Sequence, residues 1–236
     1  MRRALDFSGP ALDNQAAAAL AEALKEQILL ERRLESTKID LALKPDFSLA
    51  DSFSFVDRVR RGRFDAHALR EALHDLRLFS SLEEAQLLVS RFDIDGTVRF
   101  ADYCYVMAPR SSEYASLLQG RSGLGGGLRS LSAETLEQLR LTWQTFLRVE
   151  IAAESLRQRL HRVGGFSAIA AFHCMDLDGT GRISKKELRS LLGEFGFIAT
   201  EKELESLISR YDKDRDGRIS YSEFAREITP HSPYRY

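Results

Sequence analysis

The sequence predicts an all-α protein with two pairs of helix–loop–helix hands, an N-terminal helix and a long amphipathic helix between the pairs. Two twelve-residue segments, 176–187 and 212–223, carry acidic residues at matching positions, and apolar residues at helical spacing flank both. A glycine-rich run separates the helical stretches of the two halves. The sequence that ends the first half, 107–114, is similar to the sequence that ends the second half, 228–234, which indicates a duplication.

The segment 212–223 places oxygen ligands at the spacing that Ca²⁺ requires. Gly217 at position 6 permits the sharp turn, and Ser220 at position 9 starts the next helix in a capping box. The residue at position 7 contributes only its backbone carbonyl, so a basic side chain there is no objection. The predicted ligands at positions 1, 3, 5, 7 and 12 are Asp212, Asp214, Asp216, Arg218 and Glu223.

A second copy of this loop lies about 36 residues upstream. Its predicted ligands are Asp176, Asp178, Thr180, Arg182 and Glu187. On these two motifs the chain resembles the EF-hand superfamily, of which calmodulin and centrin are the best-known members. The resemblance implies that the two loops pair back to back, with Ile183 and Ile219 forming a short two-stranded bridge.

Residues 1–46 are predicted to form an arm followed by a helix. Gly9-Pro10 interrupts the first 14 residues, and a strongly helix-forming stretch follows from Gln15 to about Leu43. Leu20, Leu24, Ile28 and Leu34 form a stripe on this helix that needs a packing partner. Lys44-Pro45 should end the helix, because a residue before proline is pushed out of the helical region.

Residues 47–118 are predicted to form a degenerate pair of hands. The first has Asp57 at loop position 1, Gly62 at position 6 and Phe64 at position 8. Val59, Arg61 and Ala68 occupy positions 3, 5 and 12, and further arginines surround the turn. A divalent cation would meet repulsion and almost no ligands, so we expect no metal there.

The second hand, 91–102, allows two alignments. Keeping twelve positions around Gly96 puts Arg91 at position 1, whereas matching Arg91-Phe92-Asp93 to Arg210-Tyr211-Asp212 implies two deleted residues. In both alignments Asp102 holds position 12 and a normal ligand set is missing. Ser81 and Glu84 predict a capping box on its entering helix.

Residues 119–130 read as a flexible linker rich in glycine. The helix predicted over 131–165 opens with Ser132 as N-cap. Its apolar residues are predicted to form one continuous seam: Leu139, Trp143, Phe146, Val149, Ala153, Leu156, Leu160 and Val163. Two interpretations stay open, a structural seam and a helix that fills the protein's own groove. Arg148, Arg157, Arg159 and Arg162 are interpreted as its solvated face.

Residues 166–229 form the predicted calcium-binding pair, and 230–236 a tail. Phe166 should start the entering helix of the third hand, and Thr200 with Glu203 predicts a capping box for the fourth. The run 107–114 after the second hand is echoed by 228–234 after the fourth, which supports the duplication.

A narrower resemblance rests on the segments 31–47 and 109–118 and on the helix around Arg148-Val149-Glu150. They are similar to those of a group of four-hand calmodulin-like proteins of ciliated and flagellated protists. The resemblance implies two EF-hand pairs separated by a long helix. It also suggests a ciliary, flagellar or cytoskeletal setting.

Composition narrows the function classes. The formal net charge is −1, so nothing global points to nucleic acid. Cys104 and Cys174 fit a reducing compartment. The start of the chain lacks a signal-peptide pattern and no segment predicts membrane insertion, so we expect a cytoplasmic protein. No nucleophile and base pair is evident, which argues against an enzyme.

We therefore expect a regulatory or sensor protein that binds two Ca²⁺ ions with dissociation constants of about 10⁻⁷–10⁻⁵ M. Loop 212–223 offers more carboxylates and should bind more tightly. The sequence has only three Met, so one or few protein partners are expected, bound by a helix in a groove or by docking on a scaffold. The alternative is a structural protein, cytoskeletal or ciliary, in which Ca²⁺ only stabilises the C-terminal pair.

Overall fold

The computed structural model describes residues 12–92, 95–121, 123 and 131–231. These residues fall into two compact units: unit 1 comprises 12–28 and Ser155–Pro230, and unit 2 comprises the described part of Leu29–Glu154 together with His231. Helices and two short antiparallel strand pairs make up the regular structure, so the all-α fold class is confirmed. None of the described helices has the length and apolar character needed to cross a membrane. The arm 1–11, most of the predicted linker and the tail 232–236 lie outside the described residues.

Two long helices, α1 (Asn14–Ala42) and α7 (Ala133–Leu160), contribute residues to both units. As predicted, α1 ends before Lys44-Pro45, and Ser132 caps α7, its Oγ accepting a hydrogen bond from the Thr135 N–H at 3.2 Å. The prediction of a helix to residue 165 was too long. The chain leaves the helix after Leu160, and Gly165 has a φ of +76°, a backbone conformation outside any right-handed helix.

The apolar residues that were predicted to form one continuous seam on α7 pack in two separate cores. Its first half, from Leu139 to Val149, packs in the core of unit 2, whereas Leu160 packs in the core of unit 1. The stripe on α1 divides in the same way, with Leu24 in unit 1 and Leu34 in unit 2. The spacing of apolar residues is uniform along both helices, so it carries no sign of this division.

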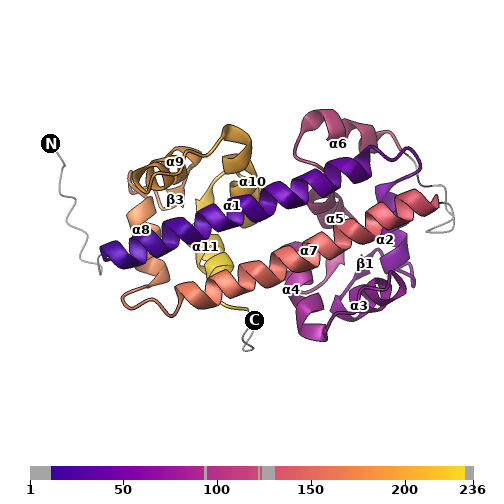
Figure 1. Ribbon diagram of the computed structural model, residues 1–236, viewed down its shortest axis with the longest axis horizontal. Helices are drawn as coiled ribbons and strands as arrows, with labels where there is room; N and C mark the ends of the chain where they lie inside the picture. The colour runs from indigo at the N-terminus through magenta and orange to yellow at the C-terminus, as the bar shows by residue number, and fades with distance from the viewer. Residues whose placement is uncertain (1–11, 93–94, 122, 124–130, 232–236) are drawn as a thin grey trace. The chain divides into compact units, whose positions relative to one another are not determined.

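Unit 1 contains the two acidic loops (Figure 1). Its remaining helices and strands are α8 (Ala168–Met175), β3 (Arg182–Ile183), α9 (Lys185–Glu194), α10 (Glu201–Tyr211), β4 (Ile219–Ser220) and α11 (Tyr221–Ile228). The strands pair antiparallel with Ile183 opposite Ile219, which confirms the bridge that the resemblance implies. α8 begins two residues after Phe166, because Ser167 is extended and acts as the N-cap. α8 contacts α11, and α9 contacts α10.

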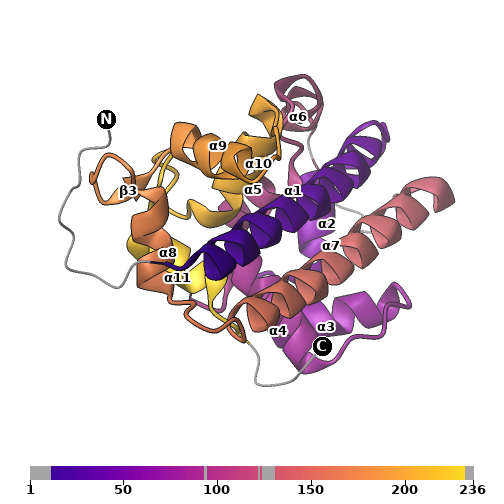
Figure 2. The same ribbon diagram turned by 60° about the vertical axis from the view of Figure 1, so that its left-hand side comes forward.

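Unit 2 repeats this arrangement with α3 and α4 next to each other (Figure 2). Its elements are α2 (Leu49–Val56), β1 (Arg63–Phe64), α3 (Ala66–Asp75), α4 (Leu82–Phe92), β2 (Val98–Arg99), α5 (Phe100–Met107) and α6 (Ser112–Gln119). Phe64 lies opposite Val98, as Ile183 lies opposite Ile219 in unit 1. The predicted capping box at Ser81 and Glu84 is confirmed by reciprocal hydrogen bonds of 2.8 and 3.2 Å.

Aromatic packing decides between the two alignments of the second hand. Phe92 stacks on Tyr103 with ring centroids 6.0 Å apart, and Tyr211 stacks on Phe224 at 6.1 Å. Each pair joins the last residue of an entering helix to the fourth residue of an exiting helix. The structure therefore matches Arg91-Phe92 to Arg210-Tyr211, which is the alignment with two deleted residues. Asp93 itself lies outside the described residues.

The predicted repeat also has a structural counterpart. After Pro109, the Arg110 N–H donates to the carboxylate of Glu35 on α1 at 2.6 Å. After Pro230, the His231 N–H donates to the carboxylate of Glu154 on α7 at 3.1 Å. In both halves, the backbone just beyond the exiting helix is held by an acidic residue of a long helix.

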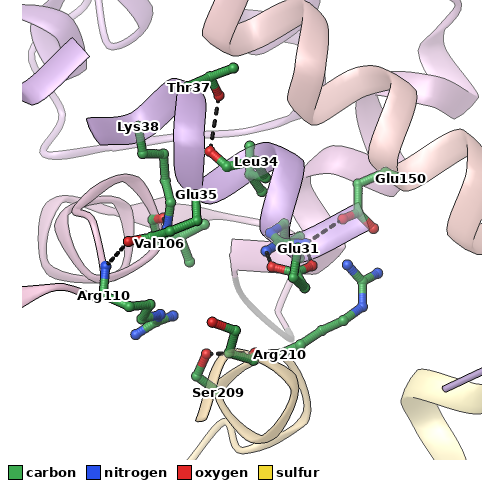
Figure 3. Close-up of polar contacts among 12 residues, drawn as sticks. Glu31, Leu34, Glu35, Thr37, Lys38, Val106, Arg110, Glu150, Ser209 and Arg210 are labelled. Atoms are coloured by element: carbon green, nitrogen blue, oxygen red, sulfur yellow. Dashed lines mark hydrogen bonds and ion pairs between the residues drawn. The ribbon is translucent and has the colours of Figure 1, made fainter. Parts of the chain in front are cut away.

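Among the described residues, two buried ion networks were not predicted from the sequence. In unit 2, the Arg91 guanidinium pairs with Glu31 at 2.6 Å and Glu150 at 2.7 Å, so the two carboxylates point toward one cation (Figure 3). In unit 1, Glu227 pairs with Arg157 at 2.9 Å and with Arg210 at 2.7 Å. Burial makes each of these charges costly, and pairing with an opposite charge offsets that cost.

Arg157 corrects the interpretation of α7's arginines as a solvated face. Arg148, Arg159 and Arg162 are exposed as predicted, but Arg157 is 2% exposed. Its Nε also donates to the Glu227 backbone carbonyl at 2.8 Å. A charged residue inside the apolar seam is thus satisfied by a partner about 70 residues away, which no local pattern indicates.

Candidate metal centre

The loop 212–223 joins α10 to α11. Asp212 lies at the end of α10, and its carboxylate accepts hydrogen bonds from the N–H groups of Asp216 and Gly217 at 3.1 and 2.8 Å. Gly217 has a φ of +83°, which explains the requirement for glycine at this turn. The carboxylates of Asp212, Asp214 and Asp216 converge, with oxygen atoms within 4.8 Å of one another.

Glu223 reaches back across this loop from the first turn of α11. One oxygen accepts from the Lys213 N–H at 2.7 Å, and the other accepts from the N–H and hydroxyl of Ser220 at 2.9 and 2.7 Å. The predicted capping box at Ser220 is confirmed. One side chain therefore ties the start of the loop to the start of the exiting helix.

The loop 176–187 is built in the same way. Asp176 accepts from the Thr180 and Gly181 N–H groups at 3.0 and 2.9 Å, and Glu187 accepts from the Leu177 N–H at 2.9 Å. Asp176, Asp178 and Glu187 converge within 4.8 Å. The Thr180 hydroxyl donates to the Arg182 carbonyl at 3.2 Å, so two of the predicted ligands contact each other.

Burial shapes the electrostatics of both loops. Asp176, Glu187, Asp212 and Glu223 are each less than 10% exposed, although all are acidic. Burial raises the pKa of Asp212, and the neighbouring Asp214 and Glu223 add to the rise. Burial acts in the same direction on Glu223, but its hydrogen bonds outweigh it and lower the pKa. Buried, converging carboxylates are stabilised by a bound cation.

The donor set fits Ca²⁺. Carboxylate, hydroxyl and backbone carbonyl oxygens are the hard ligands that this ion prefers. Asp176, Asp178, Thr180 and Glu187 would hold one ion together with the Arg182 carbonyl. The residues for the second are Asp212, Asp214, Asp216, Glu223 and the Arg218 carbonyl. When bound, the ion would supply positive charge at the point where the carboxylates of each loop converge.

Arg182 and Arg218 hold position 7 of the two loops. Their backbone carbonyls are predicted ligands of their own loop, whereas their side-chain charges act on the other loop. The Arg182 guanidinium forms an ion pair with Asp216, a predicted ligand of the other loop. A hydrogen bond from Thr180 is the main cause that lowers the pKa of Asp178, and the charge of Arg218 contributes further. The spacing of ligands in the loops predicts no role for either side chain.

The first hand of unit 2 keeps the turn but not the ligands. Asp57 accepts from the Arg61 and Gly62 N–H groups at 2.9 and 2.7 Å, as the first aspartate of each acidic loop does. Val59 at position 3 is 70% exposed and offers no oxygen ligand from its side chain. No cluster of three metal-ligating side chains forms in the described part of unit 2.

Comparison with known proteins agrees with this geometry. Residues 167–229 match the family model of the EF-hand domain pair. Calcium-binding protein 7 of Homo sapiens is 42% identical over 60 residues, covering 25% of this chain and 28% of that protein. Calcium-binding protein E63-1 of Drosophila melanogaster is 45% identical over 58 residues, covering 25% and 30%.

Probable calcium-binding protein CML11 of Oryza sativa is also 45% identical over 58 residues, 25% of this chain and 28% of that protein. This chain therefore aligns with less than a third of each of these relatives. The family model covers both acidic loops. Residues 167–229 are an EF-hand domain pair, and the relatives that this chain resembles are calcium-binding proteins.

Proposed function

We propose that this protein is a calcium-dependent regulator that binds two Ca²⁺ ions in residues 176–187 and 212–223 and engages a protein partner. The observation that carries the proposal is the convergence of three carboxylates in each loop. The two loops are joined by the Ile183–Ile219 bridge, so filling one should help to order the other. The free Cys104 and Cys174 support a cytoplasmic setting.

Glu187 and Glu223 connect the loops to their exiting helices. Each lies at the third position of a helix and closes its capping box. Each carboxylate also holds a backbone N–H at the start of its loop. A change in the position of either carboxylate on ion binding would therefore move the start of α9 or α11, which is how a sensor transmits binding.

The first half of α1 packs on the EF-hand pair of unit 1, where a partner helix could otherwise bind. Leu20, Leu24 and Ile28 of α1 pack in the same cluster as Leu188 and Leu207 of the EF-hand pair. The Tyr211 hydroxyl donates to Gln27 of α1 at 2.6 Å. The first half of α1 thus takes the place of a target helix in a groove. A partner would replace this segment or bind another surface.

Two interpretations were left open for the Trp143 helix, a structural seam and an occupant of the protein's own groove, and its packing supports the structural seam. Trp143 is 1% exposed and packs with Phe92 and Phe146 in the core of unit 2. α7 supplies only its end, at Leu160, to the cluster of unit 1. Coverage by α1 also favours the second candidate function, a structural protein in which Ca²⁺ stabilises unit 1 without exposing a groove.

Calorimetric titration of the full chain with Ca²⁺ tests the proposal. We expect two sites in the wild type, and none of comparable affinity after Glu187→Gln plus Glu223→Gln, because each loop loses its bidentate ligand. Glu203→Gln is the matched control, since Glu203 closes the capping box of α10 outside both loops. Two unaltered sites in the double variant would refute the assignment.

An apolar-surface dye, read in parallel, separates the two candidate functions. A rise in dye fluorescence on filling both sites supports a regulator that exposes a partner surface. Two filled sites without that rise support the structural role. The Glu203→Gln protein should follow the wild type in both measurements.

A further inference from the structure

Arg182 belongs to both acidic loops at once. Its backbone carbonyl is a predicted ligand of loop 176–187 and accepts a hydrogen bond from the Thr180 hydroxyl. Its guanidinium forms an ion pair with Asp216, at position 5 of loop 212–223. The strand pairing explains this reach, because Arg182 lies opposite Ser220 in the β3–β4 bridge, immediately beside the second loop.

Asp216 is one of the three carboxylates that converge in loop 212–223. It already accepts a hydrogen bond from the Arg218 N–H at 2.9 Å. The ion pair with Arg182 therefore engages a carboxylate that the metal centre needs. Both partners are partly exposed, with side-chain exposures of 43% for Arg182 and 33% for Asp216, so the guanidinium can leave without breaking a core.

We infer that Arg182 competes with Ca²⁺ for Asp216 and lowers the affinity of loop 212–223. This inference rests on the proposed function, in which both loops bind the ion. The guanidinium must leave Asp216 before that carboxylate is free to act as a ligand. Its positive charge also opposes the approach of a cation.

The two loops differ in this respect. Arg218 holds the equivalent position in loop 212–223, and its charge acts on Asp178 of the other loop. The ion pair, however, is formed by Arg182. Loop 212–223 has more carboxylates, which favours a higher affinity for Ca²⁺ than that of loop 176–187. Competition by Arg182 reduces this difference in affinity between the two loops. Arg182 is thus an affinity-determining residue that is not itself a side-chain ligand.

The test uses the full chain with Glu187→Gln, so that loop 212–223 is the site titrated by calorimetry. In this background, Arg182→Gln should lower the dissociation constant for Ca²⁺ about two- to fivefold, the range of a partly exposed ion pair. Arg182→Lys keeps the charge and should restore the original value. Arg189→Gln removes an equal charge from an exposed pair with Glu201 in the same unit, and should leave the constant unchanged.

An unchanged constant in Arg182→Gln, or a change equal to that in Arg189→Gln, would overturn the inference. If Arg182→Gln alone, without Glu187→Gln, tightened Ca²⁺ binding only at loop 176–187, that result would overturn the inference as well. Those results leave the two calcium sites in place and so spare the proposed function. Absence of calcium binding by the wild type would overturn both.

Discussion

At the scale of single residues, Lys38 shows how burial changes ionisation. Its ammonium group donates to the Ala108 carbonyl at 3.0 Å and pairs with Glu35 at 3.1 Å. Burial lowers the pKa of Lys38 from 10.5 to about 8, because Glu35 only partly offsets the desolvation and the charges of Arg110 and Arg91. The folded-state pKa lies below the unfolded value, so the folded protein loses this proton first as pH rises.

The consequence is a pH-dependent difference in stability. Between about pH 8 and 10.5, the free energy of unfolding of the wild type should rise relative to Lys38→Met, by on the order of 3 kcal/mol over the whole window. Urea unfolding at several pH values measures this difference. Lys38→Arg, whose side chain stays protonated, should give the same slope against the wild type. A difference that stays constant across the window would contradict the burial of a charged lysine.

At the scale of elements, the first half of α1 is part of the core of the EF-hand pair. Leu24 is 1% exposed and packs in the cluster of unit 1. Removing its side chain should leave a cavity and lower the free energy of unfolding by about 2–4 kcal/mol. Urea unfolding of Leu24→Ala, with and without Ca²⁺, measures the loss.

Leu29 supplies the matched control on the same helix. It is 36% exposed, so Leu29→Ala should cost less than about 1 kcal/mol. Hydrogen exchange should show that Leu24→Ala loosens α9 and α10, the helices whose leucines share its cluster. Equal losses in the two variants would mean that α1 does not pack on unit 1 in solution.

At the scale of the whole molecule, calcium should stabilise the two units unequally. The single Trp, Trp143, is buried in the core of unit 2, so its fluorescence reports the unfolding of that unit. Ca²⁺ at 100 times the dissociation constant should add about 2.7 kcal/mol per site to unit 1. Ca²⁺ should therefore raise the free energy of opening measured by hydrogen exchange within 167–229. The free energy of unfolding reported by Trp143 fluorescence should rise less.

Glu187→Gln plus Glu223→Gln should abolish the calcium-dependent gain in protection, which assigns it to the two loops. If Ca²⁺ raised the stability reported by Trp143 fluorescence as much as the hydrogen-exchange stability of 167–229, the two units would unfold as one cooperative body. The continuous helices α1 and α7 are the elements that could couple them.

Local signals in the sequence were sufficient for the loops and for most helix ends. Gly217 adopts the positive φ that its place in the loop predicts. The capping boxes at Ser81, Thr200 and Ser220 form as predicted. These features depend on residues only a few positions apart, so short-range spacing is enough to predict them.

The sequence by itself determined the all-α class and the two acidic loops, and the resemblance to EF-hand proteins implied the bridge between Ile183 and Ile219. The tertiary structure alone decided which core each half of α1 and α7 enters, why Arg157 is buried and where the Arg182 guanidinium lies. Apolar periodicity marks the face of a helix that is buried but not the partner that covers it. Partner choice depends on contacts between residues far apart in the chain, and those contacts exist only after the chain has folded.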